Sequence, residues 1–241
     1  EPFFDPQAHT RRGVAFGDVV DGIVSALREG ERELGMTWRL NMCFMRDLSA
    51  VDAIQTLGEA LPYRDVIRAV GLDSYEVGNP PEKFEGVFEL ARSEGFETVS
   101  HCGEEGDADS VRRTLDLLRV SRVDHGIAAM SDPELVARLV EERIPLTVCP
   151  LSNVRLRVVP SLAEHPLRAM LDAGIVVTVN SDDPAYFGGY LLDNLRAVIE
   201  SLGVDREELR VLARNSFEAA FLAPAETDAR LAEVDAFFAQ S

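Results

Sequence analysis

The amino-acid sequence predicts an α/β fold, a (β/α)8 barrel that occupies residues 1–241 as a single domain. Three observations support this prediction. Short apolar segments typical of buried strands alternate with segments of helical periodicity along the whole chain, which indicates parallel strands joined by helical crossovers. An open, doubly wound sheet would be expected to carry a glycine-rich phosphate-binding turn, and the sequence has none. Polar side chains follow the predicted strands at their C-terminal ends, which is where a barrel has its active site.

The first part of the chain illustrates the alternation. Residues 3–4 are interpreted as the tail of a strand, and residues 16–34 carry apolar side chains at helical spacing and stop at Gly35. Ser49 is a suitable N-cap for a helix that runs to about Ala60. The other strands are expected at residues 38–45, 66–72, 96–100, 122–124, 145–148 and 175–179. A further helix is expected to begin near Pro81. The remaining helices are expected at residues 109–120, 132–142, 165–172, 193–201, 206–215, 217–222 and 227–239.

The side chains capable of chemistry gather at the strand ends. They are Asp5, Arg46 and Asp47, Asp73 to Glu76, His101 to Glu104, His125, Cys149 to Asn153, and Asp182 with Asp183. The adjacent carboxylates Asp182 and Asp183 follow a buried strand, where they repel each other and lose hydration. Such a pair indicates a cation or a hydrogen-bonded ligand. The alternative is an Asp-Asp-Pro turn whose acids cap a helix.

Composition limits the classes of function. The formal net charge of -18 argues against nucleic-acid binding, because nothing offsets the repulsion of the phosphates. No apolar segment approaches the roughly 20 residues that a membrane-spanning helix needs, and the N-terminus has no signal-peptide pattern. Three cysteines, Cys43, Cys102 and Cys149, lie in or beside apolar strands and are expected to be reduced thiols of a cytoplasmic protein.

A metal-assisted reaction is the chemistry that these residues suggest. His101 and Asp182 offer an imidazole nitrogen and a carboxylate oxygen, which are normal zinc ligands, although a catalytic zinc usually has three protein ligands. Glu104 follows His101 closely, and Gly103 allows the backbone to turn so that Glu104 can exchange protons with a substrate and a water. His125 could hydrogen-bond an attacking hydroxide. The alternatives are core histidines bonded to backbone carbonyls and a solvated loop acid.

Four motifs resemble those of one family, the adenosine/adenine deaminases, which are zinc-dependent (β/α)8 aminohydrolases of the metal-dependent hydrolase kind. In order they are His101-x-Gly-Glu104, Asp124-His125-Gly126, Cys149-Pro-Leu-Ser-Asn153 and Ser181-Asp-Asp-Pro184. Further segments are similar to the adenine deaminase branch: Phe3-Phe-Asp-Pro-Gln7, Gly71-Leu-Asp-Ser74, Glu76-Val-Gly78 and Asn180 to Gly189. The resemblance covers nearly the whole chain.

The resemblance implies a role for each catalytic residue. His101 and Asp182 would be ligands of one Zn²⁺ per subunit, and a zinc-activated hydroxide would attack C6 of a 6-aminopurine. Glu104 would carry a proton to N1 of the purine, and His125 would orient the hydroxide. The expected reaction is the hydrolysis of adenine to hypoxanthine and ammonia.

The resemblance also assigns the substrate contacts. Asp183 would bind the purine at N7, Asp73 is assigned to substrate binding, and Glu76 would lie near the N3/N9 edge. A carboxylate there could accept a hydrogen bond from N9–H, which a nucleoside lacks, so the free base is expected to be preferred. The alternatives are a deaminase of adenosine or of an N6-substituted adenine, and a catalytically inactive member of the family.

The chain departs from the family pattern in its histidines. The family supplies two further zinc ligands from a His-x-His pair on the first barrel strand, and no two of His9, His101, His125 and His165 have that spacing. His9 and His165 are expected to have surface roles. Only seven strands are predicted where a closed barrel has eight. We therefore expect the chain to be N-terminally incomplete, with the absent strand located between residues 3–4 and 175–179.

Overall fold

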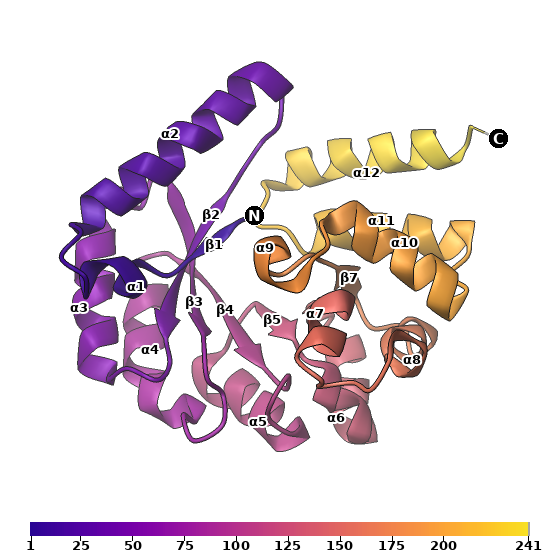
Figure 1. Cartoon of the computed structure of the whole chain (residues 1–241), viewed down its shortest axis with the longest axis horizontal. Coiled ribbons are helices and arrows are strands. Elements are labelled where there is room, and N and C mark those ends of the chain that lie inside the picture. Colours follow the sequence, from indigo (N-terminus) through magenta and orange to yellow (C-terminus); the bar gives the residue numbers. More distant parts are fainter. Residues whose placement is uncertain (241) are drawn as a thin grey trace. The chain divides into compact units, whose positions relative to one another are not determined.

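The computed structural model describes residues 1–240, which form two compact units of parallel strands and helices (Figure 1). The first unit comprises Glu1–His101 and Arg113–Ser121. The second comprises Cys102–Arg112 and the chain from Arg122 onward. Within each unit the strands pair in parallel with their neighbours in the sequence, which confirms the predicted connection by helical crossovers.

The first unit is organised around four strands. They are β1 (Phe3–Phe4), β2 (Leu40–Met45), β3 (Ile67–Asp73) and β4 (Glu97–Cys102). Its helices are α1 (Pro6–Thr10), α2 (Phe16–Leu34), α3 (Ala50–Ala60) and α4 (Glu85–Ser93), with a π-helical turn at Thr114–Leu118 and 3-10 turns at Leu61–Tyr63 and Pro81–Phe84. Gly35 ends α2 in the left-handed region, and Ser49 caps α3 in a capping box, as the sequence predicts.

Strand β2 is buried along nearly its whole length, as expected for a parallel strand that is covered on both faces. Phe44 on β2 packs edge-to-face against Phe88 on α4, with ring centroids 6.2 Å apart. Helices α3 and α4 lie side by side against this sheet (Figure 1). At the C-terminal end of β2, the backbone N–H of Met45 donates to Gln7 Oε1 at 2.8 Å, which ties α1 to that end of the strand.

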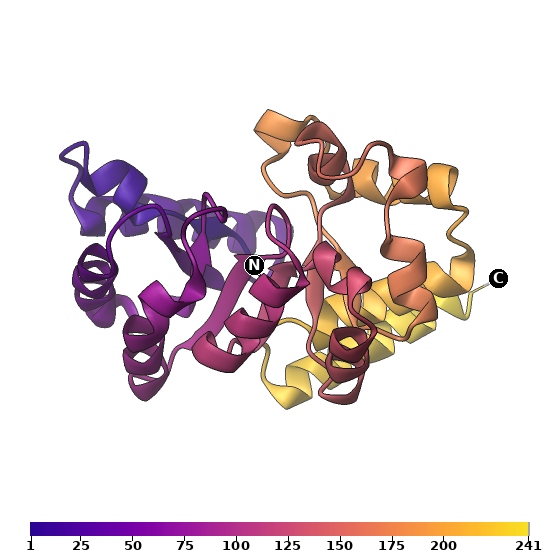
Figure 2. The same cartoon turned by 90° about the horizontal axis from the view of Figure 1, so that it is seen from below.

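The second unit has three strands, β5 (Arg122–His125), β6 (Leu146–Val148) and β7 (Val177–Val179). Its helices are α5 (Ala108–Arg113), α6 (Pro133–Glu141), α7 (Pro150–Arg155), α8 (Leu167–Asp172), α9 (Pro184–Phe187), α10 (Leu191–Leu202), α11 (Arg206–Glu218) and α12 (Pro224–Phe238), with 3-10 turns at Ile127–Ser131 and Leu162–Glu164. Helix α11 is tied to β7 by Asn215 Nδ2, which donates to the Val177 carbonyl at 2.9 Å. Helix α12 packs along α11 (Figures 1 and 2), where Asp235 pairs with Arg210 and Arg214.

The residues after β6, for which no secondary structure was predicted, form helix α7, and Pro150 suits its first turn. Two sequence expectations for local structure were wrong. Helix α11 runs through Phe217 to Glu218, so the separate helix expected at 217–222 does not exist. His165 lies before α8 in extended backbone, which the following proline favours. Within residues 1–240, no helix is both long and apolar enough to cross a membrane.

Candidate active site

Two chemically capable residues of the second unit have left-handed backbone conformations at strand ends. His125 ends β5 with φ 65°, and Asp182 follows β7 with φ 54°. A residue with a Cβ atom pays roughly 1–2 kcal/mol in this region, which is usually offset by constraints around a functional site. Gly126, which follows His125, has φ 68° and lies so close to Leu146 that a Cβ atom would meet its side chain at 2.8 Å. The positions of His125 and Asp182 therefore require a backbone conformation that is locally unfavourable in energy.

Glu104 is delivered by a tight turn directly after β4. Gly103 has φ 63°, and a Cβ atom there would lie 2.3 Å from Val111, so only glycine fits. The Gly103 carbonyl accepts from the N–H of Ala128 at 2.9 Å, and the Cys102 carbonyl accepts from the N–H of Gly126 at 3.0 Å. These bonds fasten the turn to the segment that follows β5, which confirms the expectation that Gly103 lets the backbone reverse.

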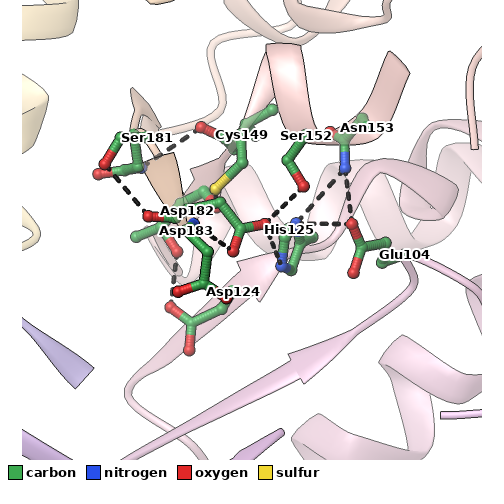
Figure 3. Close-up of polar contacts among 12 residues, drawn as sticks. Glu104, Asp124, His125, Cys149, Ser152, Asn153, Ser181, Asp182 and Asp183 are labelled. Atoms are coloured by element: carbon green, nitrogen blue, oxygen red, sulfur yellow. Dashed lines mark hydrogen bonds and ion pairs between the residues drawn. The ribbon is translucent and has the colours of Figure 1, made fainter. Parts of the chain in front are cut away.

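Glu104, His125 and Asn153 point toward one another in the resulting arrangement (Figure 3). Glu104 Oε1 accepts from Asn153 Nδ2 at 2.9 Å and lies 3.3 Å from His125 Nδ1. The side chain of His125 is only 2% exposed and that of Glu104 is 14% exposed. Oε1 of this shielded carboxylate thus lies within reach of one amide nitrogen and one ring nitrogen, which hold the carboxylate in place for proton exchange.

Asp182 lies on the opposite side of the His125 ring. Its Oδ2 atom is 3.9 Å from His125 Nε2 and accepts from Ser152 Oγ at 2.6 Å (Figure 3). Its Oδ1 atom accepts from the backbone N–H of Asp183 at 2.9 Å. Both oxygens are therefore positioned by neighbours, whereas the side chain of Asp183 itself is exposed. The two adjacent acids differ in their surroundings, as expected for residues with separate roles.

Cys149 completes a set of possible metal donors. One donor atom from each of His125, Cys149 and Asp182 lies within 4.8 Å of the others. Nitrogen, sulfur and oxygen donors of this kind fit Zn²⁺. Burial, followed by the charges of Asp182 and Glu104, raises the pKa of the Cys149 thiol well above its ordinary value. Without a metal the thiol therefore stays protonated, and Cys149 does not act as a nucleophile.

His165 is the largest departure from the sequence-based expectation. It was expected at the surface, yet it is 3% exposed, and its Nε2 atom lies 3.2 Å from Asn153 Oδ1. Its Nδ1 atom accepts from the backbone N–H of Leu167, the first residue of α8, at 3.1 Å. The surface prediction was wrong because an isolated histidine in the sequence carries no sign of what covers it. His9, in contrast, is exposed as expected.

The other predicted site residues belong to the first unit. His101 packs its ring edge-on against Phe3, and its carbonyl accepts from Nη1 of the fully buried Arg46 at 2.8 Å. Glu76 is 8% exposed, and Asp73 ends β3. The roles of His101, Asp73 and Glu76 in metal and substrate binding stay predictions.

Sequence reasoning gave three residues no role in this site: Ser152, Asn153 and His165. Ser152 and Asn153 are fully buried on α7, where Ser152 bonds to Asp182 and Asn153 bonds to Glu104. Their motif after β6 was visible in the sequence, but their partners lie 30 and 49 residues away along the chain. The local sequence does not identify hydrogen-bond partners that are so distant along the chain.

Comparison with known proteins is consistent with this arrangement. The profile of the adenosine deaminase family matches residues 1–237. The adenine deaminase of Cupriavidus necator is 55% identical over 238 residues, which cover 99% of this chain and 68% of that protein. The crystal structure of an adenine deaminase from Arthrobacter aurescens superposes with a TM-score of 0.95 at 47% identity, covering 98% of this chain and 72% of that chain, which confirms the predicted fold class. An amidohydrolase from Burkholderia ambifaria, solved with bound zinc, has a TM-score of 0.93 at 29% identity, covering 98% of this chain and 67% of that one.

Proposed function

This chain belongs to the adenosine deaminase family, and from that premise we propose that it catalyses the hydrolytic deamination of adenine to hypoxanthine and ammonia. The observation that carries the proposal is the placement of Glu104, whose Oε1 atom is held by Asn153 and His125 next to Asp182. In the reaction, the C6–N bond breaks and a C6–O bond forms with an oxygen from water. We propose the free base as the substrate because similar proteins are named adenine deaminases.

Glu104 is the proposed acid and base of the reaction. It takes a proton from the attacking water and gives one to N1 of the purine, so that the ring does not accumulate negative charge. The hydrogen bond from Asn153 and the proximity of His125 Nδ1 hold Oε1, and the carboxylate held in this way performs the transfer. The hydroxyl group now on C6 then loses its proton as C6=O forms, the amino group gains that proton, and the C6–N bond breaks to release neutral ammonia.

Asp182 is the proposed metal ligand in the second unit, and His101 keeps the same role by resemblance to the family. The donor atoms of His125, Cys149 and Asp182 fit Zn²⁺ in kind and in their mutual distances. When bound, zinc supplies a water that is deprotonated near neutral pH. The chain's own residues perform the other tasks: Ser152 and the N–H of Asp183 orient the Asp182 carboxylate, and His125 presents a ring nitrogen to the space beside it.

Selection of adenine over adenosine is proposed to depend on Glu76. Its side chain is largely buried, and a buried carboxylate favours a ligand that offers it an N–H donor. Adenine offers N9–H, whereas adenosine carries ribose at that atom. Asp183, exposed after β7, is proposed to bind N7.

The experiment that tests the proposal measures hypoxanthine and ammonia formation by the zinc-loaded, full-length protein. We expect a higher kcat/KM for adenine than for adenosine, and a reduced ratio between the two in Glu76→Gln. Glu85→Gln, an exposed acid in the first turn of α4, is the control and should keep the wild-type ratio. Absence of product from both purines would refute the deaminase proposal, and a higher efficiency with adenosine would overturn the substrate.

A further inference from the structure

A buried chain of hydrogen bonds leads from the start of α8 to the proposed acid–base residue. The N–H of Leu167 donates to His165 Nδ1 at 3.1 Å, and His165 Nε2 lies 3.2 Å from Asn153 Oδ1. Asn153 Nδ2 then donates to Glu104 Oε1 at 2.9 Å. Both His165 and Asn153 are at least 97% shielded from solvent, so water does not compete for these bonds.

The first bond of this chain determines the tautomer of His165. Leu167 opens α8, and the N–H groups of a first helical turn have no partner inside the helix. His165 Nδ1 accepts this N–H and therefore carries no proton of its own, so the ring hydrogen must be on Nε2. Burial also lowers the pKa of His165 from 6.5 to about 4, which keeps the ring neutral near pH 7.

The tautomer in turn determines the orientation of Asn153. The two ends of a carboxamide have nearly the same shape, and only their hydrogen-bond partners distinguish them. With Nε2–H of His165 as a donor, Oδ1 must face His165, and Nδ2 must face Glu104. In the flipped orientation, two donors would face each other at His165, and the amide oxygen would face the Glu104 carboxylate.

We propose that His165 is a positioning residue for the acid–base step, which acts by fixing the Asn153 amide so that a donor, rather than an acceptor, faces Glu104. This inference rests on the proposed function and deepens it. His165 touches no reacting atom. It determines which end of the Asn153 amide faces Glu104, and it thereby keeps an N–H donor on Oε1 of the carboxylate.

Three variants of His165 separate this role from simple packing. Glutamine reaches as far as Nε2 and offers an N–H donor to Asn153. Asparagine reaches only as far as Nδ1, so it can serve Leu167 but not Asn153. Leucine fills similar space and serves neither. In the zinc-loaded, full-length protein, we expect kcat to stay near the wild-type value in His165→Gln and to fall about 10- to 100-fold in His165→Asn and His165→Leu. KM should change little, because the lost interaction supports proton transfer.

Two kinetic readouts distinguish positioning from general destabilisation. The acidic limb of the pH profile of kcat should move to higher pH in His165→Leu, because ionised Glu104 loses its donor, and should stay in place in His165→Gln. In an Asn153→Ala background, His165→Leu should have little further effect on kcat, since residues that act through one another are not additive. Equal losses in His165→Gln and His165→Leu, or an undiminished effect in the Asn153→Ala background, would overturn the proposal.

A spectroscopic measurement tests the same inference without turnover. In full-length protein labelled with nitrogen-15 at histidine and asparagine, we expect His165 to be the neutral Nε2–H tautomer between pH 5.5 and 8. The Asn153 amide signals should shift in His165→Leu far more than in His165→Gln. Protonation of His165 within that pH range, or an Nδ1–H tautomer, would contradict the proposal. If the wild-type protein deaminates neither purine, the proposed function fails, and this measurement still decides the role of His165.

Discussion

The chain after β6 and the chain after β7 begin alike and end in different surroundings. Each strand passes into a short helix that opens with proline, α7 at Pro150 and α9 at Pro184. On α7, Ser152 and Asn153 are fully buried. On α9 no residue is buried, and Tyr186 is 80% exposed.

The difference shows that a short helix opening with proline after a strand can serve two purposes. The β6 end is anchored from several sides, for example by Asn194 Oδ1, which accepts from the N–H of Leu151, and its polar groups point inward to hold Glu104 and Asp182. At the β7 end, Asp182 is held by Ser152 and by the N–H of Asp183, whereas the Asp183 side chain is exposed. We infer that the β6 end positions the reacting groups, whereas the β7 end presents one ligand and one substrate contact.

The largest expected effect concerns the two acids at the β7 end. Asp182→Ala should lose bound zinc and with it all measurable turnover, because a catalytic zinc seldom has protein ligands to spare. Asp183→Ala should keep the metal and lose substrate affinity, since Asp183 holds Asp182 through its backbone N–H, which alanine keeps. Zinc stoichiometry of the two purified variants is the measurement. Retention of metal by both, or its loss from both, would contradict the division of roles.

Glu104→Gln should lower kcat by about 100- to 10,000-fold while zinc content and fold are kept. The amide can still accept from Asn153 Nδ2, so the β6 end stays assembled, but it cannot exchange a proton at neutral pH. The control is Glu105→Gln, because Glu105 is exposed next to it. Near-normal turnover of adenine by Glu104→Gln would show that another group moves the proton.

The buried β6 end also predicts a pH dependence of folding stability. The unfolded chain binds a proton on His165 as the pH falls through about 6.5, whereas the folded protein resists protonation until about pH 4. Neutral His165 therefore contributes stability that is fully present above pH 6.5 and is lost as the pH falls from 6.5 to 4. The loss amounts to up to roughly 3 kcal/mol. Urea unfolding at pH 7.5 and at pH 4.5 measures this loss in the free energy of unfolding. In His165→Gln, which has no titrating side chain at this position, most of the loss should disappear.

His9→Gln is the matched control for this measurement, because His9 is exposed on α1 and its loss should leave the pH dependence unchanged. The same pH dependence in wild-type protein and in His165→Gln would mean that the buried histidine does not resist protonation.

The smallest expected effects come from substitutions that compare how much α7 and α9 contribute to stability. Ser152→Ala should lower the free energy of unfolding by roughly 1–2 kcal/mol, because it removes a buried hydrogen bond to a carboxylate. Tyr186→Ala should change it by less than about 0.5 kcal/mol, because the side chain is mostly solvated. Urea unfolding of both variants at pH 7.5 provides the values. A larger loss in Tyr186→Ala would show that α9 is packed more firmly than its exposure indicates.

The sequence by itself determined the features that depend on neighbouring residues. Alternating apolar segments identified the strands, Ser49 and Gly35 marked helix ends, and Gly103 marked the turn that carries Glu104. These follow from backbone sterics and from hydrogen bonds that close within a few residues. The motif residues His125 and Asp182 were found in the same way, since His125 ends β5 and Asp182 closely follows β7.

Only the tertiary structure decided which of these residues meet and which are buried. The sequence does not indicate that Asn153 bonds to Glu104 across 49 residues, or that His165 is covered and contacts that asparagine. The physical reason is that the desolvation of a histidine, and therefore its pKa and tautomer, depends on all the atoms around it. Neighbours along the chain supply few of those atoms, and packed elements supply the rest.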